Sequence, residues 1–270
     1  MKIKNSQILF ALVAIISLSS CQEVIDIELN DADRKFVIEG GVFEGSDSAM
    51  VRVTKTASYF SEGPAEGVTD ALVQLTMPDN SIIEMTHMGN GMYRAQGLNV
   101  INEANYGLKV SVDNQVFTAT SYMMPSVALD SLEYEYQEPI FGQEDGYNVF
   151  LHFQDQFGKN FYRMRSAVNR RPLNKVEDIQ VVDDNLNDGN PIRIPIFTHL
   201  YKAGDTVEVE LQSLDAELYE FYQTFAAAAS EDSGSPFTAA PSNPETNIKG
   251  GALGVFGAYT TSRRVIILPQ

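Results

Sequence analysis

The sequence of 270 residues predicts a mainly β protein with short antiparallel strands and one amphipathic helix. Apolar and polar residues alternate in many short segments, which places the apolar side chains on one face of a strand. Turn-forming residues separate these segments, for example at 78–80, 89–91, 157–160 and 203–205. Many short strands joined by frequent turns are typical of antiparallel sandwiches.

The alternation also predicts where the strands lie. The best period-two segments, in which apolar side chains alternate, cover residues 51–53, 73–77, 108–112, 149–153, 161–165, 192–194 and 207–211. A further strand is expected at 264–268, at the end of the sequence. We expect these segments to form the sheets of the protein.

One segment instead has the period of a helix. Its apolar residues recur at i, i+4, i+7, i+8 and i+11, which is one helical face: Leu214, Leu218, Phe221, Tyr222 and Phe225. Ser213 or Asp215 can cap the start, and Glu217 suits the positive dipole of the first turn. We therefore expect a helix from about 214 to 229, followed by a loop rich in Ser, Pro, Asp and Gly to about 245.

Two β-rich domains are expected. Residues 36–125 form a plausible small sandwich, and residues 126–270 form a larger β-rich domain that contains the helix. The segment at Met124, Pro125 and Ser126 is a natural boundary because proline interrupts regular structure. No long linker separates the two parts, so we expect them to pack together.

Charge and cysteine content exclude several classes of protein. The chain has 19 basic and 36 acidic residues, a formal charge of −17, which repels phosphate backbones and argues against nucleic-acid binding. The single cysteine excludes an intramolecular disulfide framework and a thiolate zinc cluster. We expect no metal or organic cofactor.

The N-terminus has the features of a signal peptide. Lys2 and Lys4 precede an apolar segment at 8–18 that is too short to span a bilayer stably, and small residues then lead to Cys21. A cysteine at this place resembles the lipobox of bacterial lipoproteins. The resemblance implies removal of residues 1–20, a diacylglycerol and an acyl chain on Cys21, a tether over 21–35 and a membrane anchor.

Two further resemblances come from the mature chain. The alternating strand at 69–75, the turn Gly89-Asn-Gly-Met-Tyr93 and the strand at 106–110 resemble the carboxypeptidase-regulatory type of Ig-like sandwich. The lipobox cysteine with segments 24–27, 36–40, 244–248 and 250–257 resembles an uncharacterised Bacteroidota lipoprotein family catalogued as domain of unknown function 4249. The first resemblance implies that the N-terminal sandwich is Ig-like.

The family resemblance implies a location and a partner. It suggests a non-enzymatic outer-membrane lipoprotein that assists a TonB-dependent receptor in binding or taking up an extracellular ligand. The family has no established catalytic residues. Which side of the outer membrane the body faces is left open, with the cell surface favoured. The alternatives are a surface adhesion or envelope-assembly module and, less favoured, a hydrolase of surface polymers.

Two groups of residues are candidates for ligand or partner binding. Arginine side chains suit carboxylates, phosphates or interface pairs, and four gather here: Arg163, Arg165, Arg170 and Arg171. The favoured interpretation is a solvent-facing strand that neutralises nearby acids, and the alternative is a contact surface for the partner receptor. Gly250 and Gly251 begin a glycine-rich run that could contact a ligand or partner, or could allow tight bends and close sheet packing. No helix pattern follows the run, as a dinucleotide loop would require.

The remaining candidates are weaker. Asp184 and Asp188 lie in an acidic turn that only partly fits a calcium loop, since Leu186 and Pro195 take positions that need ligands. A solvated turn is the favoured interpretation. Four tyrosines could form a sugar-stacking surface or fill a core: Tyr134, Tyr136, Tyr147 and Tyr162. The three histidines are far apart in sequence and have no metal-binding spacing.

Overall fold

A computed structural model describes residues 34–57, 63–139, 144–185, 187–196, 199–230 and 243–270. The predicted signal peptide, the lipidation site Cys21 and nearly all of the predicted tether lie outside these residues. The described chain belongs to one unit, Arg34–Gln270. Within it, no helix is long and apolar enough to cross a membrane.

The described residues form strands over most of their length. The strands of the first half are β1 (Phe36–Phe43), β2 (Ser48–Lys55), β3 (Leu72–Thr76), β4 (Ile82–Glu84), β5 (Thr86–Gly89), β6 (Met92–Gln96), β7 (Ala104–Val112) and β8 (Gln115–Met123). Those of the second half are β9 (Leu129–Gln137), β10 (Gly146–Gln154), β11 (Phe161–Val168), β12 (Arg171–Pro172), β13 (Gln180–Asp183), β14 (Pro191–Pro195), β15 (Thr206–Leu214) and β16 (Leu253–Ile267). A short 3-10 helix, η1 (Val176–Asp178), and the α-helix α2 (Ala216–Ser230) complete the set.

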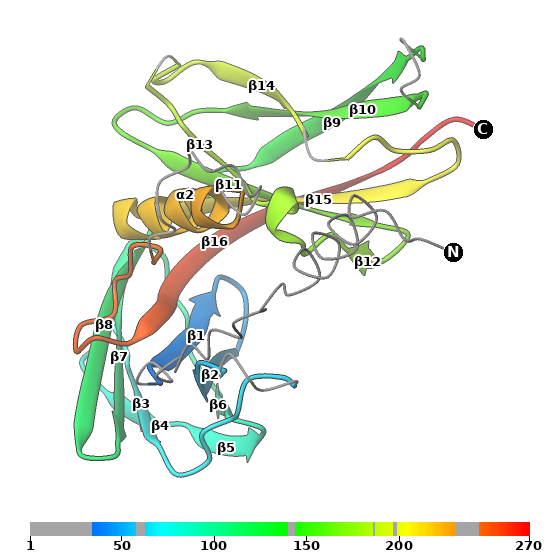
Figure 1. Ribbon diagram of the computed structural model, residues 1–270. Coiled ribbons are helices and arrows are strands. Elements are labelled where there is room, and N and C mark those ends of the chain that lie inside the picture. Colours follow the sequence, from blue (N-terminus) through cyan, green and yellow to red (C-terminus); the bar gives the residue numbers. More distant parts are fainter. Residues whose placement is uncertain (1–33, 58–62, 140–143, 186, 197–198, 231–242) are drawn as a thin grey trace, which may run out of the picture. The chain divides into compact units, whose positions relative to one another are not determined.

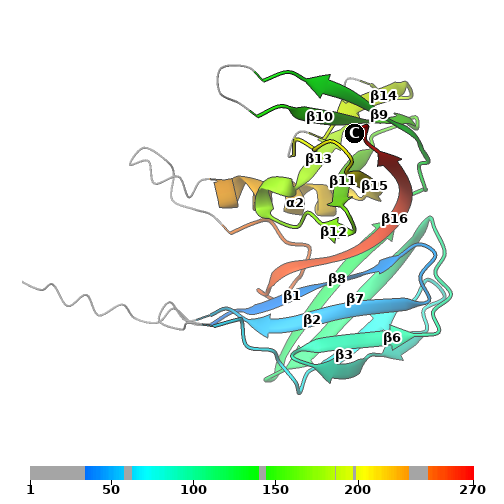
Figure 2. The same cartoon turned by 90° about the vertical axis from the view of Figure 1, so that its right-hand side faces the viewer.

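The largest sheet runs through the whole described unit (Figure 1). Its nine strands include the path β12-β11-β15-β16-β1-β2-β6-β5, and β13 also pairs with β11. Strand β16 is 15 residues long, and its first part pairs in parallel with β1 while its second part pairs antiparallel with β15. Figure 2 shows β16 passing from the strands of the first half to those of the second.

Two smaller sheets cover this central sheet and enclose two hydrophobic cores. The four-stranded sheet β4-β3-β7-β8 encloses the first core, where Ile38, Val73 and Val110 are fully buried. The three-stranded sheet β14-β10-β9 encloses the second core with Leu129 and Leu151. These paired sheets, with one α-helix among the described residues, confirm the predicted fold class, which is mainly β with sandwiches.

The range predicted for the first sandwich, 36–125, is incomplete. Phe256 and Ala258 of β16 belong to the first core, although they lie more than a hundred residues beyond Met123. The parallel pairing of β1 with β16 brings them there. The domain boundary at residue 125 stays a prediction. The core of the first sandwich, however, also contains residues of β16.

Helix α2 packs on the face of the central sheet opposite to both cores. Alternate residues of β16 reveal this, because Phe256 points into the first core whereas Val255 and Tyr259 pack with Leu218 and Phe221 of α2. The helix begins two residues later than predicted. Leu214 ends β15, and the Asp215 side chain caps α2 by accepting a hydrogen bond from the Leu218 N–H at 2.9 Å.

Substitution of Gly251 and Gly254 can test how closely β1 and β16 approach each other. Both Gly251 and Gly254 have positive φ, at 90° and 98°, so alanine would be strained at either site by about 1–2 kcal/mol. A Cβ at Gly254 would also overlap the Ile38 carbonyl oxygen of β1, whereas a Cβ at Gly251 would meet no atom. We predict that Gly254→Ala lowers the free energy of unfolding by about 1–3 kcal/mol more than Gly251→Ala.

Urea unfolding of the full chain, followed by circular dichroism, measures this difference directly. Gly251→Ala is the matched control, since it carries the same backbone strain without the clash. Equal losses of stability in the two variants would contradict the close approach of the strands.

Candidate functional site

A cavity of about 340 Å³ lies between α2 and the central sheet. Its walls come from β1, β11, β15 and β16, from α2 and from the segment around η1. The cavity therefore joins residues from the beginning, the middle and the end of the described chain. Cavities of this size are within the range that small ligands occupy in proteins.

The floor of the cavity depends on two glycines that face each other in the β1–β16 register, Gly41 and Gly257. A Cβ at Gly257 would overlap the ring of Tyr259, and a Cβ at Gly41 would lie 2.9 Å from that ring. Glycine at both positions lets the Tyr259 ring lie against the sheet, where Phe43 stacks on it with ring centroids 5.0 Å apart. The position of this tyrosine is thus set by the sheet beneath it.

Tyr259 in turn positions the helix side of the cavity. Its hydroxyl lies 2.9 Å from the hydroxyl of Tyr222 on α2. Complete burial raises the pKa of Tyr259 well above its ordinary value, and the nearby Tyr222 adds to the shift. Tyr259 therefore stays neutral at physiological pH and can share a hydrogen bond with Tyr222.

Arg163 of β11 stacks on the ring of Tyr222. Its Cζ lies 3.8 Å from the centre of the Tyr222 ring, which is a cation–π contact. The Nε atom of Arg163 is buried and has no hydrogen-bond partner among the described residues. No carboxylate of the described chain pairs with this guanidinium, so its charge is available in the cavity wall.

Gln212 of β15 is the direct cross-strand neighbour of Arg163. Its side chain is almost completely buried, at 1% exposure. The Nε2 atom donates to Glu210 Oε1 at 2.5 Å, while Oε1 is buried without a partner among the described residues. Buried polar atoms are nearly always paired in proteins, so this oxygen marks a place where a ligand group or water is expected.

The next cross-strand row carries excess positive charge. Glu210 lies between Arg165 and Arg263, with Arg165 Nη1 at 3.6 Å and Arg263 Nη2 at 2.5 Å from its carboxylate. Two arginines therefore share one acid beside a third, uncompensated arginine. In a chain of formal charge −17, this face concentrates positive charge next to the cavity.

The candidate binding residues from the sequence divide into two groups. Arg163 and Arg165 line the cavity, whereas Arg170 and Arg171 are exposed at the turn between β11 and β12 and do not line it.

The two candidate glycines lie away from the cavity. A Cβ at Gly250 would approach the Val116 carbonyl oxygen at 2.6 Å, which explains this glycine by close packing on β8. Gly251 is exposed. Contact of a ligand or partner with Arg170, Arg171, Gly250 or Gly251 stays a prediction.

Gln212 and Tyr259 are site residues that the sequence did not predict. Gln212 continues the polar side of an alternating strand, which is the pattern of a solvent-facing position. Tyr259 only marked the end of the glycine-rich run. Neither residue carries a local signal that α2 covers it.

A second cluster joins three aspartates from two loops. Asp155, Asp184 and Asp188 each offer a carboxylate oxygen, and these atoms lie within 4.8 Å of one another. Calcium binds oxygen ligands at about 2.3–2.6 Å, so three oxygens at this spacing could surround one ion. Asp155 follows β10 and is far from the other two aspartates in sequence. The sequence of the acidic turn at 183–189 therefore did not predict that Asp155 belongs to the cluster.

Hydrogen bonds from the chain already engage all three carboxylates. Asp155 accepts from the Tyr162 hydroxyl and from Gly189 N–H, Asp184 accepts from Asn160 N–H, and Asp188 accepts from Gly158 N–H. Burial raises the pKa of Tyr162, and its bond to Asp155 raises it further. The cluster therefore ties the loop after β10 to the loop before β14, and the calcium site stays a prediction.

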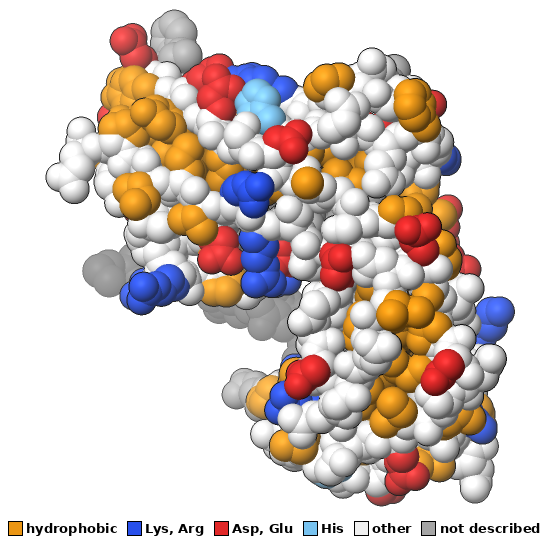
Figure 3. Space-filling model, turned by 180° about the vertical axis from the view of Figure 1, so that it is seen from behind, with side chains coloured by type: hydrophobic (Ala, Val, Ile, Leu, Met, Phe, Trp, Pro, Cys, Tyr) orange, Lys and Arg blue, Asp and Glu red, His pale blue; other side chains and the backbone are white. Residues whose placement is uncertain are grey.

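A third candidate lies on β9 and β10, on the face of their sheet that also carries Val149 and Leu151 of the second core. Tyr134 and Tyr136 are 41% and 53% exposed and contact the ring of Tyr147 edge-on, whereas Tyr162 is fully buried in the second core. Figure 3 shows hydrophobic side chains gathered at one end of the molecule and a histidine among acidic and basic neighbours. Of the four candidate tyrosines, only Tyr134, Tyr136 and Tyr147 therefore lie together in one group of rings.

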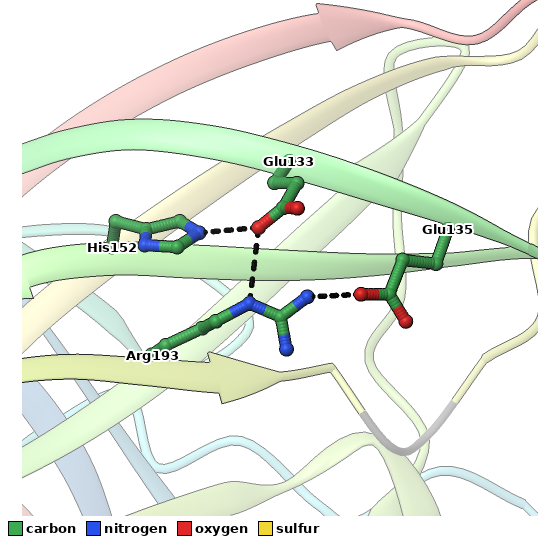
Figure 4. Close-up of polar contacts among 4 residues, drawn as sticks. All are labelled: Glu133, Glu135, His152 and Arg193. Atoms are coloured by element: carbon green, nitrogen blue, oxygen red, sulfur yellow. Dashed lines mark hydrogen bonds and ion pairs between the residues drawn. The ribbon is translucent and has the colours of Figure 1, made fainter.

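A charged network lies on the opposite face of β9, β10 and β14 from these tyrosines. Glu133 Oε2 lies 2.8 Å from His152 Nε2 and 3.0 Å from Arg193 Nε, and Arg193 Nη2 reaches Glu135 at 2.5 Å (Figure 4). Arg193 also lies over the ring of Phe150. All four charged side chains are solvent-accessible, so the network orders the strand surface and contributes little to stability.

Comparisons with known proteins place the chain in a family. The family model described as "Domain of unknown function (DUF4249)" matches residues 22–264, which confirms the resemblance predicted from the sequence. No curated protein matches the chain. Among solved structures, the chain is similar to the chicken CNTN1 FN1-FN3 domains, with 10% identity and a TM-score of 0.27; the match covers 86% of this chain and 66% of that one, just under two thirds of its length.

The network around Glu133 provides a testable titration. The Arg193 guanidinium and, to a lesser degree, His152 hold the pKa of Glu133 below its ordinary value. We predict that Arg193→Gln raises the pKa of Glu133, as measured by carboxyl-carbon NMR titration. A lowered pKa in the folded state stabilises the protein above the unfolded-state pKa, and this contribution disappears as the pH falls through the folded-state pKa.

Arg171→Gln is the matched control, because it removes an exposed arginine outside the network. It should leave the titration of Glu133 unchanged. An unaltered Glu133 pKa in Arg193→Gln would show that the network does not form in solution.

Proposed function

The chain belongs to the family described as a domain of unknown function (DUF4249), and we propose that it is a lipid-anchored ligand-binding protein of the bacterial outer membrane. It holds an extracellular ligand for a TonB-dependent receptor. The cavity beneath α2 carries the proposal, because Arg163 and Gln212 have buried polar atoms there without partners among the described residues. A few polar groups facing an apolar, aromatic wall are the usual composition of a small-ligand site.

The lipidation motif supports the membrane anchor. Cys21 follows a short apolar segment and small residues, as in bacterial lipoproteins. Each methylene group of the acyl chains that enters the bilayer contributes about 0.8 kcal/mol to membrane binding. We place the binding domain on the membrane through the tether at 21–35, with the cell surface as the favoured side.

A surface hydrolase is the less favoured role for the cavity. Hydrolysis of a glycosidic polymer usually requires two carboxyl groups about 5–10 Å apart on either side of the bond. The acids that line the cavity are Glu39 and Asp178, and Asp178 already accepts a hydrogen bond from the Lys175 N–H. We therefore propose binding rather than catalysis.

The exposed tyrosines favour a second candidate function. Tyr134 and Tyr136 form an aromatic surface that suits contact with another macromolecule, as in an adhesion or envelope-assembly module. This surface is made by β9 and β10, whereas the cavity is made by other strands and α2. The two functions therefore use different residues and can be separated by substitution.

The anchor and the receptor are tested together by fractionation. We predict that the full chain is recovered with the outer membrane and that Cys21→Ser moves to the soluble fraction, because the acyl chains are lost. Affinity purification from detergent-solubilised outer membranes should then recover a TonB-dependent receptor in stoichiometric amount with the full chain. Recovery of the anchored chain without a receptor would reject the accessory role.

Complementation of a deletion strain separates binding from adhesion. We predict that Arg163→Met fails to restore growth on the nutrient whose uptake the protein assists, because the cavity loses its unpaired charge. The double substitution Tyr134→Ser with Tyr136→Ser should restore that growth. If only the tyrosine variant fails, and fails in surface attachment, adhesion is the function.

A further inference from the structure

We infer that the cavity beneath α2 binds a small organic acid that carries a hydrogen-bond donor next to its carboxylate and an apolar, aromatic-sized body. This inference deepens the proposed function and rests on its ligand-binding part. Three features of the cavity carry it, namely the Arg163 guanidinium with its unpaired Nε, the unpaired amide oxygen of Gln212 and the aromatic wall of α2.

Arg163 indicates the acidic group. One face of its guanidinium is covered by the Tyr222 ring at 3.8 Å, so a ligand approaches the edge of the fork, where the N–H groups are. Arg165 and Arg263 are shared by Glu210, but Arg163 has no carboxylate partner among the described residues. A planar carboxylate matches this fork and supplies the missing charge.

Gln212 indicates a donor beside that group. Its amide cannot be turned over, because the oxygen would then face the carboxylate oxygen of Glu210 that now accepts from Nε2 at 2.5 Å. The free atom is therefore the acceptor Oε1, and it requires an O–H or N–H from the ligand. Since Gln212 and Arg163 are directly paired across β11 and β15, one compact group can reach both side chains.

The wall of α2 indicates the body of the ligand. Phe221 and Phe225 are stacked with ring centroids 5.6 Å apart, and both line the cavity with Val255. Apolar surface of this kind is stabilised by an apolar partner that excludes water. A volume of about 340 Å³ suits a single aromatic or branched side chain attached to the acid.

Other ligand classes satisfy only part of the site. A neutral sugar could donate to Gln212 but would leave the charge of Arg163 unpaired. The dianionic group of a phosphate monoester could pair with Arg163 but has no donor for Gln212. The combination of both groups with an apolar body is found in aromatic 2-hydroxy acids and in N-acyl amino acids.

Titration calorimetry with the full chain in detergent tests the inference on four compounds. The two complete probes are 3-phenyllactate, with a hydroxyl donor, and N-acetylphenylalanine, with an amide donor. The two deficient probes are 3-phenylpropionate, which lacks the donor, and 3-phenyl-1,2-propanediol, which lacks the carboxylate. We expect at least one complete probe to bind about 10-fold more tightly than both deficient probes, because each deficient probe leaves a buried polar atom unpaired.

Two substitutions assign the groups to residues. Gln212→Leu should bring the affinity of the better complete probe down to that of 3-phenylpropionate, whose own affinity stays unchanged. Arg163→Met should weaken the binding of every carboxylate probe that binds the unaltered chain about 10-fold or more and leave that of the diol unaffected. Arg171→Met is the matched control, since this arginine is exposed and does not line the cavity. The four-compound comparison on the unaltered chain holds even if a variant fails to fold.

Each outcome decides the inference. Equal affinity for all four compounds, or no binding of any, overturns it. If no probe binds while a TonB-dependent receptor is still recovered with the anchored chain, the ligand class is wrong and the proposed function stands. If a complete probe binds selectively but no receptor is recovered, the ligand class stands and the receptor partnership is wrong.

Discussion

The structure depends on one long strand that belongs to both sandwiches. Strand β16 forms a parallel ladder with β1 and then, without interruption, an antiparallel ladder with β15. The ladder hydrogen bonds leave little freedom between its two ends, because both lie on the same stretch of backbone. The first sandwich, the second sandwich and α2 are therefore built on one continuous sheet, and the close approach at Gly254 holds β16 against β1.

The cavity is a consequence of this arrangement. Strand β16 brings Tyr259 onto two glycines, Tyr259 meets Tyr222 of α2, and Tyr222 supports the guanidinium of Arg163. Each contact fixes the next, so the polar groups of the wall are held in place before any ligand arrives. Preorganisation of this kind lowers the entropic cost of binding.

Charge is distributed unevenly over an acidic protein. Around the cavity Arg165 and Arg263 share Glu210, and Arg163 remains unpaired, while on the outer face of β9 two glutamates surround Arg193. The exposed ion pairs of Arg193 with Glu133 and Glu135 contribute little to the stability of the fold. The buried face is different, because an unpaired group there costs free energy that a ligand can recover. The proposed binding role would give this otherwise unfavourable arrangement a use.

Local patterns in the sequence predicted eight of the sixteen described strands and the helix α2. The predicted strand segments became β2, β3, β7, β10, β11, β14, β15 and β16, and the helical spacing of Leu218, Phe221 and Tyr222 became the buried face of α2. These features depend on neighbouring residues, so a single sequence contains them. The family could also be recognised, because its motifs are contiguous.

Only the tertiary structure decided the site. On β11 and β15 the alternation places Arg163 and Gln212 on a polar face, and a polar face is the same in sequence whether water or a helix covers it. The parallel pairing of β1 with β16 and the meeting of Asp155 with Asp184 likewise join segments that are remote along the chain. Alternation specifies which side chains share a face, whereas long-range packing decides what that face touches.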